Sequence, residues 1–275
     1  MKRVAFIINF NPTKWLGGFN YIYNLIFFLK KYNIKNIDPV IITNNKKYFK
    51  KPYNFKGVKI LETNLVNKDN SIQNIVRKLK IIIFGKDNLL ESFLLENKIY
   101  ATSHFEFTGS KSKIKSFTWF PDFQEINLPE NFSYKSRILR RVNLYLAMRH
   151  SSKLLISSNS VLLDLKKISK KSYNKAVLIK HAINLPKFKF TKVNNSVLKK
   201  NKIKKKFFFL PNQYMKHKNH IIVLQALKKI KKKIDFQIVT TGKQIDHRFP
   251  QYTRLLKNFI KKNKLENNFV ELGII

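Results

Sequence analysis

The stretch FFFLPNQYMKHKNHIIVLQALKKI, residues 207–230, joins an apolar run to a polar loop and then to an amphipathic helix. Residues 207–210 are typical of a strand, and four apolar side chains then recur at helical spacing: Val223, Ala226, Leu227 and Ile230. The loop between them carries Lys216, His217, Lys218 and His220. A strand that leads through a polar loop into a helix presents backbone N–H groups and a positive helix end to an anion. We therefore predict an α/β unit. The loop taken alone favours an ordinary turn with solvated lysines, and phosphate binding is the alternative.

The same alternation of strands and helices runs through the preceding 185 residues. Apolar runs typical of strands lie at residues 4–10, 39–43, 58–61, 99–102, 116–120, 154–157 and 176–183. Helical patterns lie around residues 22–29 and at 72–84, 89–95, 133–148 and 160–168. Strands that alternate with helices predict parallel βαβ units, so the expected fold class is α/β with parallel sheets covered on both faces.

A lysine-rich run separates the two halves. Residues 188–206, FKFTKVNNSVLKKNKIKKK, have no apolar periodicity, which favours a solvated linker over a nucleic-acid contact. We therefore divide the chain into an N-terminal Rossmann-like domain at 1–185, a basic linker at 186–206 and a C-terminal Rossmann-like domain at 207–275. The last strand expected, at 269–272, ends close to residue 275, so we expect the second domain to be incomplete in this chain.

The composition is strongly basic, with 56 Lys and Arg against 15 Asp and Glu and a formal net charge of +41. Such a surplus attracts nucleic acid, an anionic membrane leaflet or phosphorylated substrates, and does not choose among them. No apolar run approaches the roughly 18 residues of a membrane span, and the N-terminus lacks a signal-peptide cleavage site. The absence of cysteine excludes disulfides, zinc–thiolate sites and cysteine nucleophiles. We expect a cytoplasmic protein.

Two motifs follow predicted strands. Gly17 and Gly18 join the first strand to the first helix, where paired glycines let a backbone approach a ligand and adopt positive φ. A plain Gly-Gly turn is the alternative. In the second motif, WFPDFQE at residues 119–125, Asp122 and Gln124 are expected to project into the crevice at the end of their strand, or else to be structural turn residues.

Several stretches together resemble bacterial glycosyltransferases of the group 1 type, which have the two-domain GT-B architecture and act in surface-polysaccharide assembly. They are GGFNYIYNL from Gly17, WFPDFQEINLPENFS from Trp119, ISSNSVLLDL from Ile156, FLPNQYMKHKNHIIVLQAL from Phe209, and TTGKQIDHRFPQYTRLL followed by LGII. The resemblance covers nearly the whole chain in the order of the family.

The resemblance implies a retaining, metal-independent transfer of a sugar from a UDP- or GDP-linked donor to a glycan or lipid-linked acceptor, with no cofactor. It implies donor diphosphate binding by five residues: Gly17, Gly18, Gln213, Lys216 and Lys218. The family has an Arg where Gln213 stands, and Lys216 is expected to compensate. On the acceptor side the resemblance implies Asp122 as a catalytic residue, with Asn20, Trp119 and Gln124 as binding residues. The two-glutamate donor motif of the family has no counterpart before Ile275, so we expect weak activity or none from this chain alone.

The partners expected are a nucleotide-sugar, an acceptor and an anionic membrane surface at the inner face of the plasma membrane. Arginines beside apolar residues at 137–149 favour lipid contact, although a solvated helix face fits them equally. The alternative function is a non-catalytic nucleic-acid-binding or assembly protein, favoured by charge and by 24 Phe and 11 Tyr. Because the aromatic residues lie inside apolar runs, as core residues do, we expect no specific nucleic acid. The histidines, among them His104 and His181, are interpreted as structural.

Overall fold

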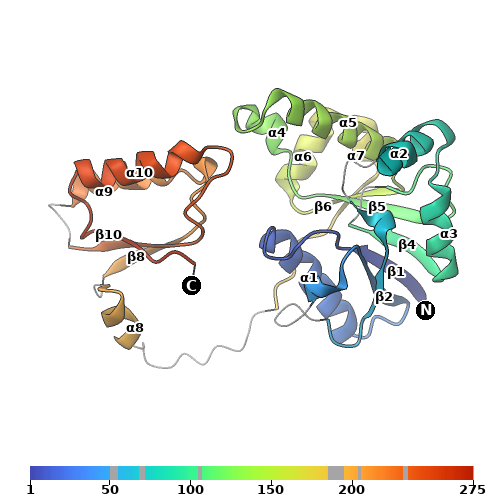
Figure 1. Ribbon diagram of the computed structural model, residues 1–275, viewed down its shortest axis with the longest axis horizontal. Helices are drawn as coiled ribbons and strands as arrows, with labels where there is room; N and C mark the ends of the chain where they lie inside the picture. The colour runs from blue at the N-terminus through green and yellow to red at the C-terminus, as the bar shows by residue number, and fades with distance from the viewer. Residues whose placement is uncertain are drawn as a thin grey trace. The chain divides into compact units, whose positions relative to one another are not determined.

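The computed structural model describes residues 1–49, 55–67, 72–104, 107–184, 195–203, 206–231 and 235–274. The chain divides into two compact units, Met1–Pro186 and Lys187–Ile275. Each unit contains a parallel sheet with helices packed on it (Figure 1), which confirms the predicted α/β fold class.

The first unit is built on a seven-stranded sheet in the order β3-β2-β1-β4-β5-β6-β7. Its strands are β1 (Lys2–Ile7), β2 (Ile37–Thr43), β3 (Lys59–Glu62), β4 (Ile99–Ser103), β5 (Lys115–Phe120), β6 (Lys153–Ile156) and β7 (Ala176–Leu178). Each neighbouring pair is parallel. The strand order reverses between β1 and β4, so the carboxyl ends of these two strands flank a topological switch point, where open α/β sheets bind ligands.

Helices cover both faces of this sheet, as expected. They are α1 (Leu16–Lys31), α2 (Ile72–Phe84), α3 (Asn88–Glu96), α4 (Gln124–Asn127), α5 (Tyr134–His150), α6 (Asn159–Ile168) and α7 (Lys170–Tyr173). The alternation of side chains along β1 separates two cores. Phe6 packs with α1 residues on one face, while Ala5 and Ile7 pack with Leu90 and Leu94 of α3 on the other.

Two strand ends differ from the sequence prediction by three residues or more. β1 ends at Ile7 rather than at residue 10, and the buried Asn9 donates a side-chain hydrogen bond to the carbonyl oxygen of Val66 at 2.7 Å. Ile8 still donates its backbone N–H to the carbonyl oxygen of Ile42 at 2.9 Å, so the chain leaves the sheet at Asn9. β7 ends at Leu178 instead of residue 183.

The second unit has a three-stranded parallel sheet in the order β10-β9-β8. Its elements are α8 (Asn195–Lys200), β8 (Phe207–Pro211), α9 (His220–Ile230), β9 (Gln237–Thr241), α10 (Pro250–Lys262) and β10 (Phe269–Glu271). α9 and α10 pack on one face of the sheet, through Leu224 and Leu256 among others. On β8, Phe207 and Phe209 remain 38% and 53% exposed, so coverage on both faces does not hold for this strand within the described residues.

The run expected to be an irregular linker contains a helix, because residues 195–200 form α8. The rest of that run at 186–194 and at 204–205 lies outside the described residues. Of the amphipathic face expected after β8, Leu227 is buried and Val223 and Ile230 pack against the same core. Ala226 is exposed instead, and Leu224 is buried in its place. Within the described residues, no helix is both long and apolar enough to cross a bilayer.

Candidate functional site

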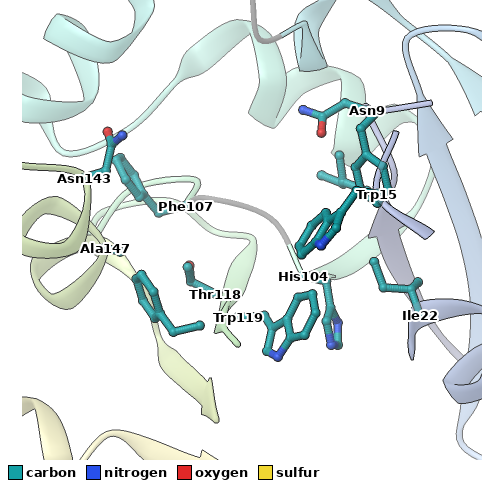
Figure 2. A pocket seen from close by; sticks show the side chains of 12 residues that line it. Asn9, Trp15, Ile22, His104, Phe107, Thr118, Trp119, Asn143 and Ala147 are labelled. Atoms are coloured by element: carbon teal, nitrogen blue, oxygen red, sulfur yellow. The ribbon is translucent and has the colours of Figure 1, made fainter. Parts of the chain in front are cut away.

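A cavity of about 170 Å³ lies at the switch point of the first unit. Its walls come from the ends of β1, β4 and β5, the first residues of α1 and the inner side of α5 (Figure 2). The residues that line it are Ile7, Asn9, Phe10, Trp15, Ile22, His104, Phe107, Thr118, Trp119, Phe120, Asn143 and Ala147. Aromatic faces with a few polar groups among them are typical of small-molecule sites.

Trp119, predicted to bind the acceptor, is the centre of an aromatic cluster. Its ring stacks on Tyr21 with centroids 4.5 Å apart and on Trp15 at 5.6 Å. The indole N–H of Trp119 donates to the hydroxyl oxygen of Ser157 at 2.7 Å, so its polar atom is satisfied. Burial raises the pKa of Tyr21 to about 12, which keeps its hydroxyl protonated. The cluster therefore forms a rigid, uncharged wall beside the cavity.

Gly17 and Gly18 occupy the first turn of α1, and neither has positive φ, so the expected left-handed conformation is wrong. A Cβ on Gly18 would lie 2.6 Å from the ring of Trp15, whereas nothing lies within 4 Å of a Cβ on Gly17. Gly18 is thus needed because it lets Trp15 fold back over the helix and reach Trp119. The first turn of α1 contains no acidic residue, and its N-cap residue makes no side-chain capping bond. The N–H groups at this helix start are therefore not capped by the side chain of the N-cap residue, and the helix dipole makes this end positive.

His104 belongs to this cavity, although the sequence indicated only a structural role. It follows β4 with φ of +62°, an uncommon value for a residue other than glycine. Its Nδ1 lies 2.8 Å from the hydroxyl oxygen of Ser103, and its Nε2 is buried without a hydrogen-bond partner among the described residues. Burial lowers the pKa of His104 to about 3, so the ring is neutral at physiological pH. A neutral ring with one unsatisfied nitrogen can bind a hydroxyl group in the cavity.

The other acceptor-side residues do not line the cavity. Asp122 follows β5 and accepts hydrogen bonds from the backbone N–H of Gln124 at 3.3 Å and from its side-chain amide at 3.1 Å. The two residues form one small polar group at the start of α4. Asn20 is exposed on α1, and its carbonyl oxygen accepts a hydrogen bond from the amide of Asn24.

In the second unit, the loops after β8 and β9 meet through Asp246. This carboxylate is 1% exposed and accepts the backbone N–H of Lys216 at 2.8 Å and that of Arg248 at 3.0 Å. Burial by itself raises the pKa of Asp246, but these N–H groups and the charge of Arg248 outweigh it and lower the pKa below its usual value. Gly242, with φ of +115°, allows the close approach of the loops, since a Cβ there would lie 2.9 Å from the carbonyl oxygen of Asn212 and the backbone nitrogen of Gln213. The sequence placed Gly242 and Asp246 in a family motif without giving either a role.

The predicted diphosphate residues of this unit lie on one loop at the carboxyl end of β8. Gln213, Lys216 and Lys218 are exposed, and residues 216–218 form a 3₁₀ turn just before α9. The ammonium group of Lys216 lies over the ring of Phe249 at 4.4 Å, which orients its side chain. His217 adds a contact at 3.1 Å to the guanidinium of Arg248. The loop thus gathers several positive side chains at the start of a helix.

His220, the other titratable residue of this loop, faces inward. It is fully buried and its ring packs on Tyr214 at 4.5 Å, while the hydroxyl group of Tyr214 lies 2.7 Å from that of Thr240. Burial lowers the pKa of His220, so it contributes no charge to the loop. These contacts anchor the loop to the sheet. Among the described residues, no group of three or more His, Cys, Asp or Glu is arranged to hold a metal ion.

No family model and no curated protein matches the chain, but solved structures do. HepE from Anabaena, solved with UDP and glucose, matches with a TM-score of 0.65 at 14% identity over 100% of this chain and 70% of that chain. The lipopolysaccharide outer core galactosyltransferase WaaB matches with a TM-score of 0.57 at 12% identity, over 100% of this chain and 68% of that chain. The expected GT-B architecture is confirmed by these matches.

The UDP-GlcNAc 2-epimerase of Methanocaldococcus jannaschii matches as well, with a TM-score of 0.54 at 15% identity over 99% of this chain and 73% of that chain. Transferases and an epimerase therefore share this backbone arrangement, and the likeness does not select between their reactions. What it establishes is that this chain is similar to GT-B glycosyltransferases in fold, with two Rossmann-like units.

Proposed function

We propose that the protein is a glycosyltransferase that moves a sugar from a UDP- or GDP-linked donor to a glycan or lipid-linked acceptor in bacterial surface-polysaccharide synthesis. The observation that carries this proposal is the combination, in one GT-B chain, of an aromatic cavity at the switch point and a basic loop at the carboxyl end of the second sheet. Similar solved structures include a UDP-glucose complex and a lipopolysaccharide galactosyltransferase, which fits this chemistry.

The donor diphosphate is assigned to the loop of the second unit. Lys218 lies two residues before α9, and its ammonium group together with the N–H groups of that helix start favours an anion. Lys216 supplies a second positive charge, which offsets the missing arginine at Gln213. When the bond between sugar and phosphate breaks, negative charge grows on the leaving diphosphate. Groups fixed beforehand by Asp246 stabilise that charge without rearrangement.

The sugar and the acceptor are assigned to the first unit. The faces of Trp15 and Trp119 suit the apolar side of a sugar ring, and Asn143 and His104 offer polar atoms across the cavity (Figure 2). Gly17 and Gly18, at the start of α1, are assigned to the donor diphosphate only because the family resemblance implies it. Asp122 and Gln124 act on the acceptor from the end of β5.

The reaction proposed is a retaining transfer without a bound metal. The acceptor hydroxyl attacks the anomeric carbon from the side of the leaving group, and its proton passes to an oxygen of the departing diphosphate. The bond from sugar to acceptor oxygen forms as the bond from sugar to phosphate oxygen breaks. Because the leaving group accepts the proton, this step needs no strong base from the protein.

Turnover of a panel of UDP- and GDP-sugars tests this proposal. Release of free nucleotide from one donor, accelerated by a membrane or glycan extract and unaffected by EDTA, is expected. Asp122→Asn should lower the rate stimulated by the extract while leaving donor binding intact. Proton NMR of the product should show the anomeric configuration of the donor. Inversion of that configuration, or a requirement for added metal, would reject the proposed mechanism.

The similarity to an epimerase supports a second candidate, the interconversion of a UDP-sugar and its C2 epimer. That reaction needs no acceptor, so incubation with UDP-GlcNAc alone distinguishes the two. A new UDP-sugar in the absence of extract indicates the epimerase. Binding of nucleic acid without any nucleotide-sugar reaction would instead support the non-catalytic alternative.

A further inference from the structure

The helix α2 presents its apolar side to solvent. Six apolar residues, here called the α2 apolar face, are 42–80% exposed: Ile72, Ile75, Val76, Leu79, Ile82 and Ile83. At 3.6 residues per turn they occupy an arc of about 120°. A soluble helix of this pattern normally buries such a face, and monomeric proteins rarely leave a continuous apolar patch of this kind in water.

Inward contacts on the other side of α2 hold this orientation. Ile81, about half a turn away from the centre of the apolar face, is 5% exposed and packs in a cluster with Phe107, Leu146 and Ala147. Arg77 donates hydrogen bonds to the carboxylate of Asp87 at 2.8 Å and to a backbone carbonyl oxygen of the same unit. Rotation of the helix to bury the apolar face would break this buried ion pair and expose Ile81.

The neighbouring helix α5 extends the same chemistry. It contacts α2 through the cluster around Ile81, and the two helices lie next to each other in Figure 1. Its exposed apolar residues are Tyr134, Ile138, Leu139, Val142 and Tyr145. The inner side of α5 contributes Asn143 and Ala147 to the cavity at the switch point. One helix therefore connects an exposed apolar side with the wall of the candidate site.

The two helices themselves carry only positive charge. The sequences of α2 and α5 contain no Asp or Glu and carry eight basic residues: Arg77, Lys78, Lys80, Lys135, Arg137, Arg140, Arg141 and Arg149. Arg77 is paired inward with Asp87, and Arg140 lies 3.6 Å from Glu125, so these two carboxylates offset part of that charge. A second copy of the chain docked here would bring like charges together. An anionic bilayer offers apolar chains to the α2 apolar face and phosphate groups to the lysines and arginines.

We propose that α2, with α5 beside it, lies in the interface of an anionic phospholipid bilayer and brings the cavity to the membrane surface. That the membrane brings a lipid-linked acceptor to the cavity rests on the proposed function. The lipid contact itself does not require sugar transfer.

Sedimentation with vesicles tests this surface in the full chain. Vesicles of phosphatidylcholine mixed with phosphatidylglycerol are compared at low salt and at about 1 M salt, where the screening length falls to about 3 Å. The test variant is Val76→Glu with Ile83→Glu, at sites 42% and 69% exposed. The matched control is Leu163→Glu with Leu255→Glu, at sites 58% and 49% exposed outside α2 and α5. Both doubles change the net charge equally, so they separate apolar insertion from simple attraction.

We expect the wild type and the control to keep measurable binding at high salt, and the test variant to bind at least about tenfold more weakly. Equal binding by both doubles, or complete loss of wild-type binding at high salt, would overturn the proposal, since charge alone then explains the binding. A wild-type dimer that the test variant converts to monomer would also overturn it and assign the face to a protein contact. UDP titration of the test variant shows whether the proposed donor site is intact. UDP binding equal to that of the wild type means that a change in vesicle binding concerns the α2 apolar face and not the proposed function.

Discussion

The packing of Trp15 over Gly18 makes a prediction that a pair of adjacent glycines can test. Gly17→Ala and Gly18→Ala introduce the same methyl group into the same helical turn. At Gly17 the new Cβ meets nothing within 4 Å, while at Gly18 it meets the indole ring at 2.6 Å. The gain from replacing a helical glycine, about 0.5–1 kcal/mol, applies to both variants and cancels in their difference.

What remains is the cost of inserting a methyl group against a rigid ring. Overpacking of this kind costs about 1–3 kcal/mol. In a unit of this size, 1 kcal/mol shifts the melting temperature by about 2–4 °C, so Gly18→Ala should melt about 2–12 °C below Gly17→Ala. If the ring moves away instead, part of this cost is replaced by loss of its stacking on Trp119.

The chain contains two tryptophans, and both are in this stack, so circular dichroism of coupled indoles reports on it directly. We expect the coupled signal to persist in Gly17→Ala and to decrease in Gly18→Ala. Equal melting temperatures together with unchanged indole signals would refute the reasoning, because they would show that Trp15 does not lie over the first turn of α1.

Three further outcomes follow from the buried polar groups. Asp246→Asn should lower the free energy of unfolding, measured by urea denaturation, by about 1–3 kcal/mol. The lowered pKa of Asp246 gives stability that is lost as the pH falls through that pKa. The variant should therefore lose less stability than the wild type when the pH is lowered. Ser157→Ala should leave the indole N–H of Trp119 without its acceptor and destabilise by a similar amount; a red-shifted tryptophan emission checks this, and unchanged emission and stability would contradict it. The pKa of His104 is lowered to about 3, so below about pH 6.5 the unfolded chain binds a proton that the folded chain does not. The free energy of unfolding therefore decreases as the pH is lowered from about 6.5 to about 3. His104→Asn tolerates the positive φ and should reduce the difference in urea midpoint between pH 7 and pH 5; an unchanged difference would contradict this.

The α/β fold could be predicted because the apolar runs and helical patterns report burial directly. Helix α2 begins and ends where its apolar pattern does, at Ile72 and Phe84. An apolar pattern is normally taken to mark the buried side of a helix, however, and in α2 the apolar side faces solvent. That orientation depends on the contact of Ile81 with α5 and on the ion pair of Arg77, which join residues far apart in the sequence.

The candidate site was predicted unevenly for similar reasons. Trp119 could be placed at the cavity because it lies near the end of a predicted strand, whereas Gly17 and Gly18 lie in the first turn of α1 and do not line the cavity. His104 was not found, because a lone histidine after a strand carries no chemical partner in the sequence, and its neighbours Tyr21 and Trp119 meet it only in the folded unit. Asp246 was missed because its partners are backbone N–H groups, one of which belongs to a loop 30 residues away.

The loop before α9 is proposed to bind the diphosphate of a nucleotide-sugar. Calorimetric titration with UDP and GDP at physiological salt tests it most directly, with Lys218→Ala as the variant and Lys228→Ala, an exposed lysine further along α9, as the control for net charge. We predict saturable binding of one nucleotide, weakened about tenfold or more in Lys218→Ala and unchanged in Lys228→Ala, because a charged contact to phosphate is worth about 1.5–3 kcal/mol. Binding that is equal for both nucleotides, abolished by salt and identical in the two variants would contradict the claim and assign the interaction to the basic surface as a whole.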